Sequence, residues 1–408
     1  MIKNNVNIQF FLIALVISLF LPVYVLSYLK VVNFWSFSQS HIDYTFGLIP
    51  RGFFGEILNF FEKLGVTKRN SFAIIFIIVN SFNILLFFQI IKKYFQNPYL
   101  QVVLALHPVL ILFSFNDLGA YQRHEQFGIL IILLNYFILN YLNEIKKLNF
   151  FIFYLILNNI FIFVSILIHE INFFFIGFHF LMTLSFFNPK SKEVIINIIF
   201  IFLHTIFLIF LLKIDLNNDQ IQFFRKIYED QGLWFDGVVH FAVSHDFSID
   251  RFNSNFLIFE NFLINLILIS YSLILLFYLL VDNESYKKKY YIFNLLFLGN
   301  IILLIIGATI GDFGRWLHII SISNISVYAL LQNKKNIKKY EFKNKKKFLF
   351  LFIIFLSLFI LKIPHSEMYK EKNIKIYKGY YFKVFSIFNS VVKKNNDNFF
   401  DINKRFKN

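Results

Sequence analysis

Apolar segments long enough to cross a lipid bilayer recur along the whole sequence, and this feature constrains the fold more than any other. A helix that crosses a hydrocarbon core of about 30 Å needs roughly 20 mainly apolar residues. The chain is 58% hydrophobic and only 16% charged, whereas soluble domains average about 45–50% and about 25%. We therefore expect an all-α, polytopic membrane protein with about 11 transmembrane helices. The candidate spans cover about residues 8–28, 71–91, 100–115, 127–143, 150–168, 171–187, 194–214, 259–281, 291–310, 317–331 and 348–362.

Lysine-rich turns alternate with short polar motifs between these spans, and this pattern predicts helical hairpins. Residues 150–187 illustrate the point, because as a single helix they would measure about 57 Å, nearly twice the hydrocarbon thickness. The positive-inside rule then places the lysine-rich turns in the cytoplasm. The segment 332–347, with eight lysines in sixteen residues, is the clearest case. The polar motifs between the turns fall on the outer face.

This topology makes residues 1–362 one polytopic transmembrane domain with a cytoplasmic N-terminus. Its predicted outer loops are residues 29–70, 116–126, 215–258 and 311–316. Residues 363–408 form a basic C-terminal tail that we expect on the outer face. No small-residue cleavage site follows the first apolar stretch, so we expect a retained helix there and not a removed signal peptide. The expected location is the cytoplasmic (inner) membrane of a bacterium.

The composition also excludes several classes of function. The net charge of +16 fits the topology, because the lysines cluster between the apolar segments. No zinc-finger, helix-turn-helix or RNA-binding signature is present, so nucleic acid is not an expected partner. The chain has no cysteine, which excludes disulfides, thiolate metal sites and a cysteine nucleophile. HxxxH and HExxH spacings are absent, so we predict no metal site and no cofactor.

All seven arginines fall on the predicted outer face, whereas about half of the lysines lie inside. The planar guanidinium grips phosphate or carboxylate through two parallel hydrogen bonds, which the point charge of lysine cannot do. Arg123 and Arg315 are the most informative, because each lies in a short link between apolar runs. Charges at such a depth usually face a cavity or a pathway. The alternative is that the arginines pair with acidic residues on the same face.

The first outer loop contains HIDYTFGLIPRGFFGEI (41–57), in which we expect turns followed by a short amphipathic helix at 56–65 in the membrane interface. The predicted turn residues are Gly47, Pro50, Gly52 and Gly55. Asp43 is a candidate general base and Arg51 a candidate phosphate clamp, with Tyr44 as a secondary candidate. The alternative is an interfacial loop in which Asp43 is a helix N-cap and Arg51 reaches lipid headgroups.

Two further motifs lie between apolar spans. NDLGAYQRHEQ (116–126) gathers four ionisable residues within nine positions, namely Asp117, Arg123, His124 and Glu125. Such a density is costly near a bilayer unless the groups serve a site or pair internally. His169 and Glu170 form the tip of a hairpin that has almost no loop. We expect substrate binding or catalysis at these two residues. The alternative is a plain interfacial turn, in which Glu170 accepts hydrogen bonds from helix N-terminal amides.

The last two motifs are a long loop and a short one. YEDQGLWFDGVVHFAVSHDFSIDRF (228–252) predicts a folded lid with an aromatic rim, and His245 is a secondary candidate within it. GDFGRW (311–316) predicts a tight outer turn that its glycines permit. Trp316 suits the membrane–water interface. Asp312 and Arg315 would lie at the mouth of an outward-facing cavity. The alternative is a turn with an internal Asp–Arg pair.

Together, the motifs DYTFGLIPRG, AYQRHEQFGIL, HEINFFF and GDFGRW resemble those of membrane proteins encoded among bacterial surface-polysaccharide genes. The plan is similar to that of C-type glycosyltransferases and O-antigen polymerases, which are all-helical and use polyprenyl-phosphate-linked sugars at the outer face. The resemblance implies that Asp43 matches the catalytic aspartate of the first loop. It also implies that Arg123 and Arg315 match the arginines that grip the lipid phosphate. The chain departs from the glycosyltransferases in lacking a paired first-loop D-D or E-x-D.

The expected function is glycosyl transfer from a polyprenyl-phosphate-linked donor to a glycan or lipid acceptor in surface-polysaccharide or glycolipid assembly. The alternatives are an O-antigen-type polymerase, a transporter or flippase for a lipid-linked sugar, and a non-catalytic membrane protein. The candidate catalytic residues are Asp43, Glu170 and Asp312. The candidate substrate- or phosphate-binding residues are Arg51, Arg123, His124, Glu125, His169 and Arg315, with Asp117, Tyr44, Trp316 and His245 as secondary candidates.

Overall fold

The computed structural model describes residues 34–94, 121–144, 150–184, 191–214, 216–233 and 313–332, together with single residues at 21, 24, 101, 104, 105, 107, 110, 111, 113 and 235. Within these residues all regular secondary structure is helical, and no strand occurs. The described part therefore confirms the predicted all-helical class.

Four of the described helices are long and apolar enough to cross a membrane. They are α4 (Lys68–Tyr94), α8 (Glu125–Glu144), α9 (Phe151–Ile168) and α11 (Lys192–Leu212). Each of these helices contains a predicted span or nearly coincides with one, so the chain is a helical membrane protein.

Two further segments correspond to predicted spans. The 3-10 helix η2 (Glu170–Phe175) continues directly into α10 (Ile176–Leu184), and together they form a shorter apolar segment. Helix α17 (Phe313–Gln332) covers the predicted span 317–331. The predicted spans 8–28, 259–281, 291–310 and 348–362 lie essentially outside the described residues, and 100–115 is described only at single positions.

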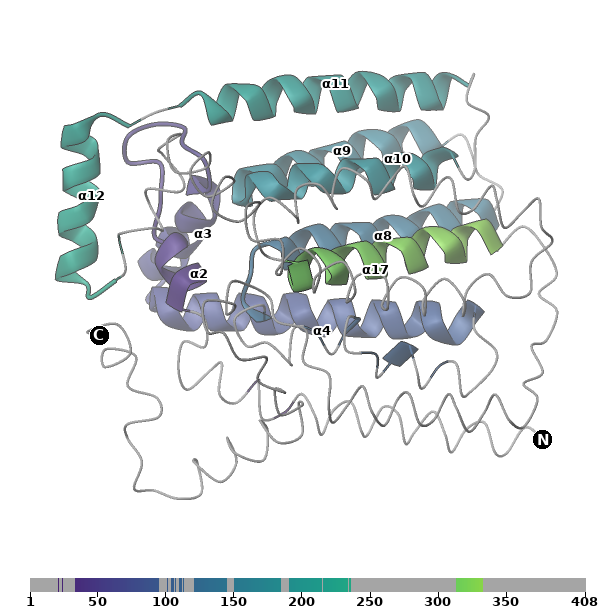
Figure 1. Cartoon of the computed structure of the whole chain (residues 1–408), viewed down its shortest axis with the longest axis horizontal. Helices are drawn as coiled ribbons and strands as arrows, with labels where there is room; N and C mark the ends of the chain where they lie inside the picture. Colours follow the sequence, from purple (N-terminus) through teal and green to yellow (C-terminus); the bar gives the residue numbers. More distant parts are fainter. Residues whose placement is uncertain are drawn as a thin grey trace, which may run out of the picture.

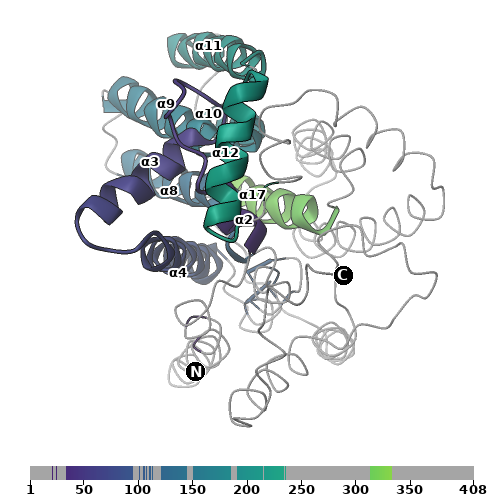
Figure 2. The ribbon, with the colours of Figure 1, turned by 90° about the vertical axis from the view of Figure 1, so that its left-hand side faces the viewer.

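The long helices lie side by side with roughly parallel axes (Figure 1), and the bundle can be viewed from one end in Figure 2. At one end, Lys93 in the last turn of α4 forms an ion pair with Glu144, the last residue of α8. We call this the lysine end. At the opposite end, α8 and α17 begin and α9 gives way to η2, with only His169 between them. The predicted hairpin with almost no loop at His169–Glu170 is thus confirmed.

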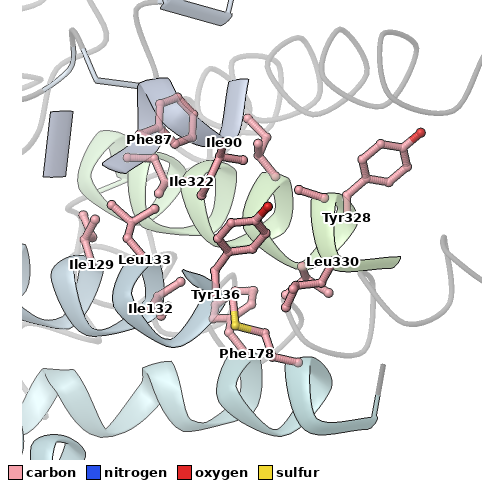
Figure 3. Packing of buried hydrophobic residues seen from close by; sticks show 14 of the residues in the cluster. Phe87, Ile90, Ile129, Ile132, Leu133, Tyr136, Phe178, Ile322, Tyr328 and Leu330 are labelled. Atoms are coloured by element: carbon pink, nitrogen blue, oxygen red, sulfur yellow. The ribbon is translucent and has the colours of Figure 1, made fainter. Parts of the chain in front are cut away.

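The core of the bundle lies between α4, α8, α10 and α17 (Figure 3). Representative side chains are Phe87 and Ile90 of α4, Leu133 and Tyr136 of α8, Phe178 of α10 and Ile322 of α17. Helix α17 is central, because every side chain from Arg315 to Leu330 is buried. Helix α11 is peripheral, and exposed side chains such as Ile198, Phe202 and Ile206 give it the apolar surface expected against lipid.

A small cap covers the end opposite the lysine end. It consists of α2 (Phe34–Gln39), the loop 40–51, α3 (Gly52–Lys63) and α12 (Asn218–Asp230). Helix α12 begins with a capping box formed by Asn217 and Gln220, and it lies across the ends of the bundle helices in Figure 1. Its buried residues Phe224 and Tyr228 pack in one cluster with Ile42 and Ile49 of the loop. The Tyr228 hydroxyl also donates a hydrogen bond to the carbonyl of Ser38 at 2.8 Å.

Two predicted turn residues, Gly52 and Gly55, are instead part of α3, so this helix begins earlier than predicted. Their role is close packing. A Cβ atom on Gly55 would lie 2.0 Å from the carbonyl oxygen of Ile42, and one on Gly52 would lie 2.5 Å from the Tyr44 ring. Gly47, with φ of +93°, is the predicted turn glycine that does adopt a left-handed backbone.

Candidate functional site

Four charged side chains from distant parts of the sequence meet at the capped end of the bundle. They are Arg51 before α3, Glu125 at the start of α8, Glu170 at the start of η2 and Arg315 in the first turn of α17. They form two ion pairs, Arg51–Glu170 and Arg315–Glu125. We call these four residues, with His124 and His169 beside them, the arginine–glutamate cluster.

Arg51 grips Glu170 through several hydrogen bonds at once. Its Nε donates to Oε2 at 2.8 Å and to Oε1 at 3.0 Å, and Nη2 also donates to Oε1. Arg51 has φ of +67°, a left-handed conformation that costs an L-residue about 1–2 kcal/mol. It also places a cation at the N-terminus of α3, where the helix dipole favours an anion. Glu170 offsets both costs, so Arg51 does not reach lipid headgroups as the alternative interpretation had it.

Glu125 and Arg315 form the second pair, with Oε1 and Nη1 separated by 3.0 Å. Both side chains are almost fully buried. Glu125 is the first residue of α8, where the helix dipole favours a carboxylate. Arg315 lies in the first turn of α17, where a cation is disfavoured, so the position of Arg315 depends on the neighbouring carboxylate.

The GDFGRW motif differs from its predicted conformation. Residues 313–316 form the first turn of α17 and not a tight loop. Trp316 is buried and not exposed at the interface, because its ring packs at 6.3 Å from Phe174 and lies 5.8 Å from Cζ of Arg315. Asp312 lies outside the described residues. Within the described part, Arg315 pairs with Glu125, an acidic residue of another helix.

His124 and His169 lie between the two ion pairs, with their ring centroids 5.9 Å apart. Burial lowers the pKa of His124 well below its ordinary value, and the adjacent His169 lowers it further. Burial also lowers the pKa of His169 to about 4, although the carboxylate of Glu170 acts in the opposite direction. Both imidazoles are therefore neutral at pH 7. His169 Nδ1 accepts a hydrogen bond from the backbone N–H of Ile171 at 3.2 Å and so caps η2.

A glycine sets the spacing between α8 and η2. A Cβ atom on Gly128 would lie 2.5 Å from the Phe175 ring and 2.7 Å from Oδ1 of Asn172. Helix α8 carries Glu125 and η2 carries Glu170, so this contact fixes how closely the two acidic residues approach one another.

Asp43 and Tyr44 lie in the cap and outside the two ion pairs. The Asp43 carboxylate accepts hydrogen bonds from the backbone and the hydroxyl of Thr45 and from Nδ2 of Asn59 at 3.0 Å. It thus stabilises a turn within the loop and ties it to α3. The backbone N–H of Tyr44 donates to Oε1 of Glu56 at 2.9 Å. Burial, with Glu56 nearby, raises the pKa of Tyr44 to about 12.

The other predicted residues are partly described. Arg123 is half-buried, with Cζ 6.0 Å from the centroid of the Trp35 ring. Asp117 and His245 lie outside the described residues.

Sequence reasoning missed several uncharged residues at this site. Ser40 lies 3.0 Å from Nε2 of His124. Asn172 donates to the carbonyl of Ser165, and Asn83 of α4 donates to the carbonyl and the side chain of Gln126. An asparagine inside an apolar span is costly unless it is bonded. The position of Asn83 within an apolar 27-residue helix was therefore the sequence feature that could have indicated a buried polar contact.

The described residues contain no group of three or more His, Cys, Asp or Glu side chains placed to hold a metal ion. The acidic residues at the site are each matched by an arginine, and a cation would meet that positive charge. The arrangement is suited to ligands that replace a carboxylate on a guanidinium or that hydrogen-bond to neutral imidazole and amide groups.

Fold and site together define a helical membrane protein with a buried arginine–glutamate cluster at the capped end of its bundle. Comparison with known proteins adds no relative, because no protein-family model, no curated protein and no solved structure matches this chain.

Proposed function

We propose that this protein transfers a glycosyl unit from a polyprenyl-phosphate-linked donor to a glycan or lipid acceptor. The reaction would take place at the outer face of a bacterial cytoplasmic membrane, at the capped end of the bundle. The observation that carries the proposal is the gathering of Arg51, Glu125, Glu170 and Arg315 at that end. Buried ionisable groups in membrane proteins are costly, and they commonly mark substrate sites.

In the proposed reaction the phosphate of the donor is the leaving group. The bond between the sugar C1 and the phosphate oxygen breaks, and a bond forms between C1 and the acceptor oxygen. The proton of the acceptor hydroxyl passes to a carboxylate, for which Asp43 at the half-exposed edge of the cap is the candidate. Guanidinium groups stabilise the negative charge that develops on the departing phosphate. Arg51 and Arg315 fill this role by exchanging a glutamate oxygen for a phosphate oxygen.

A transporter would carry its polar groups through the middle of the membrane. Four described histidines, His107, His179, His204 and His318, lie within predicted apolar spans, and two of them contact an asparagine of a neighbouring helix. His179 Nδ1 lies 2.6 Å from Nδ2 of Asn135, and His204 Nε2 lies 3.1 Å from Oδ1 of Asn159. These contacts are typical of helix packing in membranes, and they favour chemistry at one end over transit through the bundle.

The test compares variants with substitutions at the capped end and at the lysine end of the bundle, each expressed in a strain that lacks the chromosomal gene. Arg315→Lys keeps the charge but loses the planar fork, and we expect at least a tenfold loss of surface glycan, about 1.4 kcal/mol or more in the barrier. Asp43→Asn keeps the turn that binds Thr45 but cannot accept the proton, and we expect a loss of similar size.

The matched control is Lys93→Met, which breaks the exposed ion pair at the lysine end. Glycan in this strain should equal that of the wild type. Immunoblots of membrane fractions establish that all variants are inserted at similar levels. Wild-type glycan profiles from both Arg315→Lys and Asp43→Asn would refute the proposal, as would an equal loss in Lys93→Met.

A further inference from the structure

The C-terminal half of α3 exposes large apolar side chains. Phe60 is 58% exposed, and Leu64, which directly follows the helix, is 63% exposed. They continue a stripe that begins with Phe53 and Ile57, because positions i, i+4, i+7 and i+11 share one face of a helix. Phe53 and Ile57 are half-buried and pack against the cluster beneath the helix. The stripe therefore leaves the protein interior at Phe60, where the end of α3 projects from the side of the bundle (Figure 2).

Positive charge surrounds the exposed end of this stripe. Residues 60–70, which we call the α3–α4 corner, contain three cations, namely Lys63, Lys68 and Arg69. Their one carboxylate is that of Glu62, whose Oε2 lies 3.8 Å from Nζ of Lys68. Two positions along a helix correspond to a rotation of about 200°, so Glu62 lies about 160° away from Phe60 and does not interrupt the apolar stripe. The corner thus combines exposed apolar side chains with an excess of positive charge.

The corner lies at the level of the lipid headgroups, because it leads directly into a membrane-spanning helix. Helix α4 begins at Lys68, and its 27 residues measure about 40 Å, more than the hydrocarbon thickness of about 30 Å. Its polar first turn therefore lies in the headgroup region, and the exposed side chains of Ile74 and Ile78 lie further in, against lipid. Leu64 precedes Lys68 by four residues, which span at most about 14 Å. Leu64 is therefore close to the membrane surface.

Lipid is the occupant that fits both properties of the corner. In helices that lie in the membrane interface, acyl chains cover the apolar face and headgroups meet the cations. An excess of positive charge favours anionic headgroups over zwitterionic ones, and each lysine or arginine near an anionic surface strengthens binding by about fivefold. The corner is separate from the arginine–glutamate cluster, since α3 places about 18 Å between Arg51 and Lys63.

We propose that the α3–α4 corner binds anionic phospholipid in the membrane leaflet at the capped end of the bundle. Phe60 and Leu64 insert between the upper parts of the acyl chains, and Lys63, Lys68 and Arg69 contact the phosphates of the headgroups. The side chains of the apolar stripe are exposed in the present conformation, so the lipid binds without a rearrangement of the protein. This interaction goes beyond the proposed function and does not depend on it.

The experiment measures fluorescence quenching by lipid in nanodiscs that contain the full-length protein. The chain has no cysteine, so Leu64→Cys carries a single bimane fluorophore at the corner. The nanodiscs consist of phosphatidylcholine with a small fraction of either phosphatidylglycerol or phosphatidylcholine that carries a nitroxide on the acyl chain near the headgroup. Both nitroxide lipids should quench the fluorophore, and phosphatidylglycerol should do so at a concentration at least about fivefold lower. With Lys63→Gln, Lys68→Gln and Arg69→Gln combined, the two concentrations should agree within about twofold.

Two other fluorophore positions are the controls. Ile78→Cys, on the lipid-exposed side of α4, should be quenched by both lipids at similar concentrations. The same quenching at this position in the triple glutamine variant establishes that the variant is inserted. Lys226→Cys, on the exposed side of α12, should not be quenched.

Three results would overturn the proposal. Absence of quenching at Leu64→Cys by either lipid places the corner in water or against another protein. Equal quenching there by the two lipids removes the preference for anionic headgroups. A preference for phosphatidylglycerol that persists in the triple glutamine variant shows that Lys63, Lys68 and Arg69 do not provide it.

Discussion

The Glu125–Arg315 pair gives the sharpest test of the structure, because its energy can be worked from its geometry. Two unit charges 3.0 Å apart attract by about 5 kcal/mol at an effective dielectric constant of about 20. Solvent screens this pair very little, since the two side chains are only 2% and 6% exposed. Removing one partner leaves a buried charge without compensation, which typically costs about 3–5 kcal/mol.

The perturbation is a double-mutant cycle with Glu125→Leu, Arg315→Met and the double variant. Each single variant should lose about 3–5 kcal/mol of unfolding free energy. The double variant should lie within about 1–2 kcal/mol of the wild type, because it removes both charges and replaces them with apolar side chains of similar volume. The coupling free energy is therefore expected to exceed about 3 kcal/mol.

The assay is reversible unfolding in mixed detergent micelles, followed by the helical circular dichroism signal. Lys93→Met and Glu144→Leu provide the control cycle at the lysine end, where the partners are 39% and 52% exposed. Exposed pairs contribute about 0–1 kcal/mol, so the control coupling should be small. If the Glu125–Arg315 coupling is below about 1 kcal/mol, or no larger than that of the control pair, the reasoning about this cluster is wrong.

Two further predictions concern packing and pH. Gly55→Ala places a Cβ atom 2.0 Å from the carbonyl oxygen of Ile42. We therefore expect the loop 40–51 to separate from α3, with a loss of several kcal/mol in unfolding free energy. The control is Gly65→Ala, whose Cβ atom meets no other atom but whose backbone needs a positive φ, and this variant should lose only about 1 kcal/mol. The folded-state pKa of His169 is about 4, below its ordinary value, so the folded state favours the neutral ring. The contribution of neutral His169 to the unfolding free energy is therefore complete above pH 6.5, and it declines as the pH falls toward 4. From pH 7 to pH 5 the loss is about 2 kcal/mol. His169→Asn keeps an acceptor for the N–H of Ile171. Between pH 7 and pH 5 the unfolding free energy of this variant should fall by about 2 kcal/mol less than that of the wild type. An unchanged pH dependence would contradict the neutral assignment.

The sequence predicts the helices of the described part well, and the reason is physical. Hydropathy and lysine positions act locally, so α4, α8, α9 and α11 fall where the apolar runs require them. The sharp turn at His169–Glu170 follows from length alone, since residues 150–187 cannot form one straight helix in a bilayer.

The pairing of charges could not be predicted in the same way. The sequence placed Arg51, Glu125, Glu170 and Arg315 on one face and offered internal pairing as the alternative, but it contains nothing that selects partners across helices. The roles of Gly52 and Gly55 depend on the backbone of Ile42–Asp43, which only the folded chain brings near.

The distance along the chain between Arg51 and Glu170 has a consequence for biosynthesis. The two residues are 119 positions apart, so at about 5–20 residues per second a ribosome reaches Glu170 roughly 6 to 24 s after Arg51. Arg315 is translated later still, and only then can Glu125 acquire its partner. A nascent chain therefore carries incomplete charge pairs in the membrane until α17 arrives. Chains that terminate before residue 313 should be preferred substrates for membrane quality-control proteases.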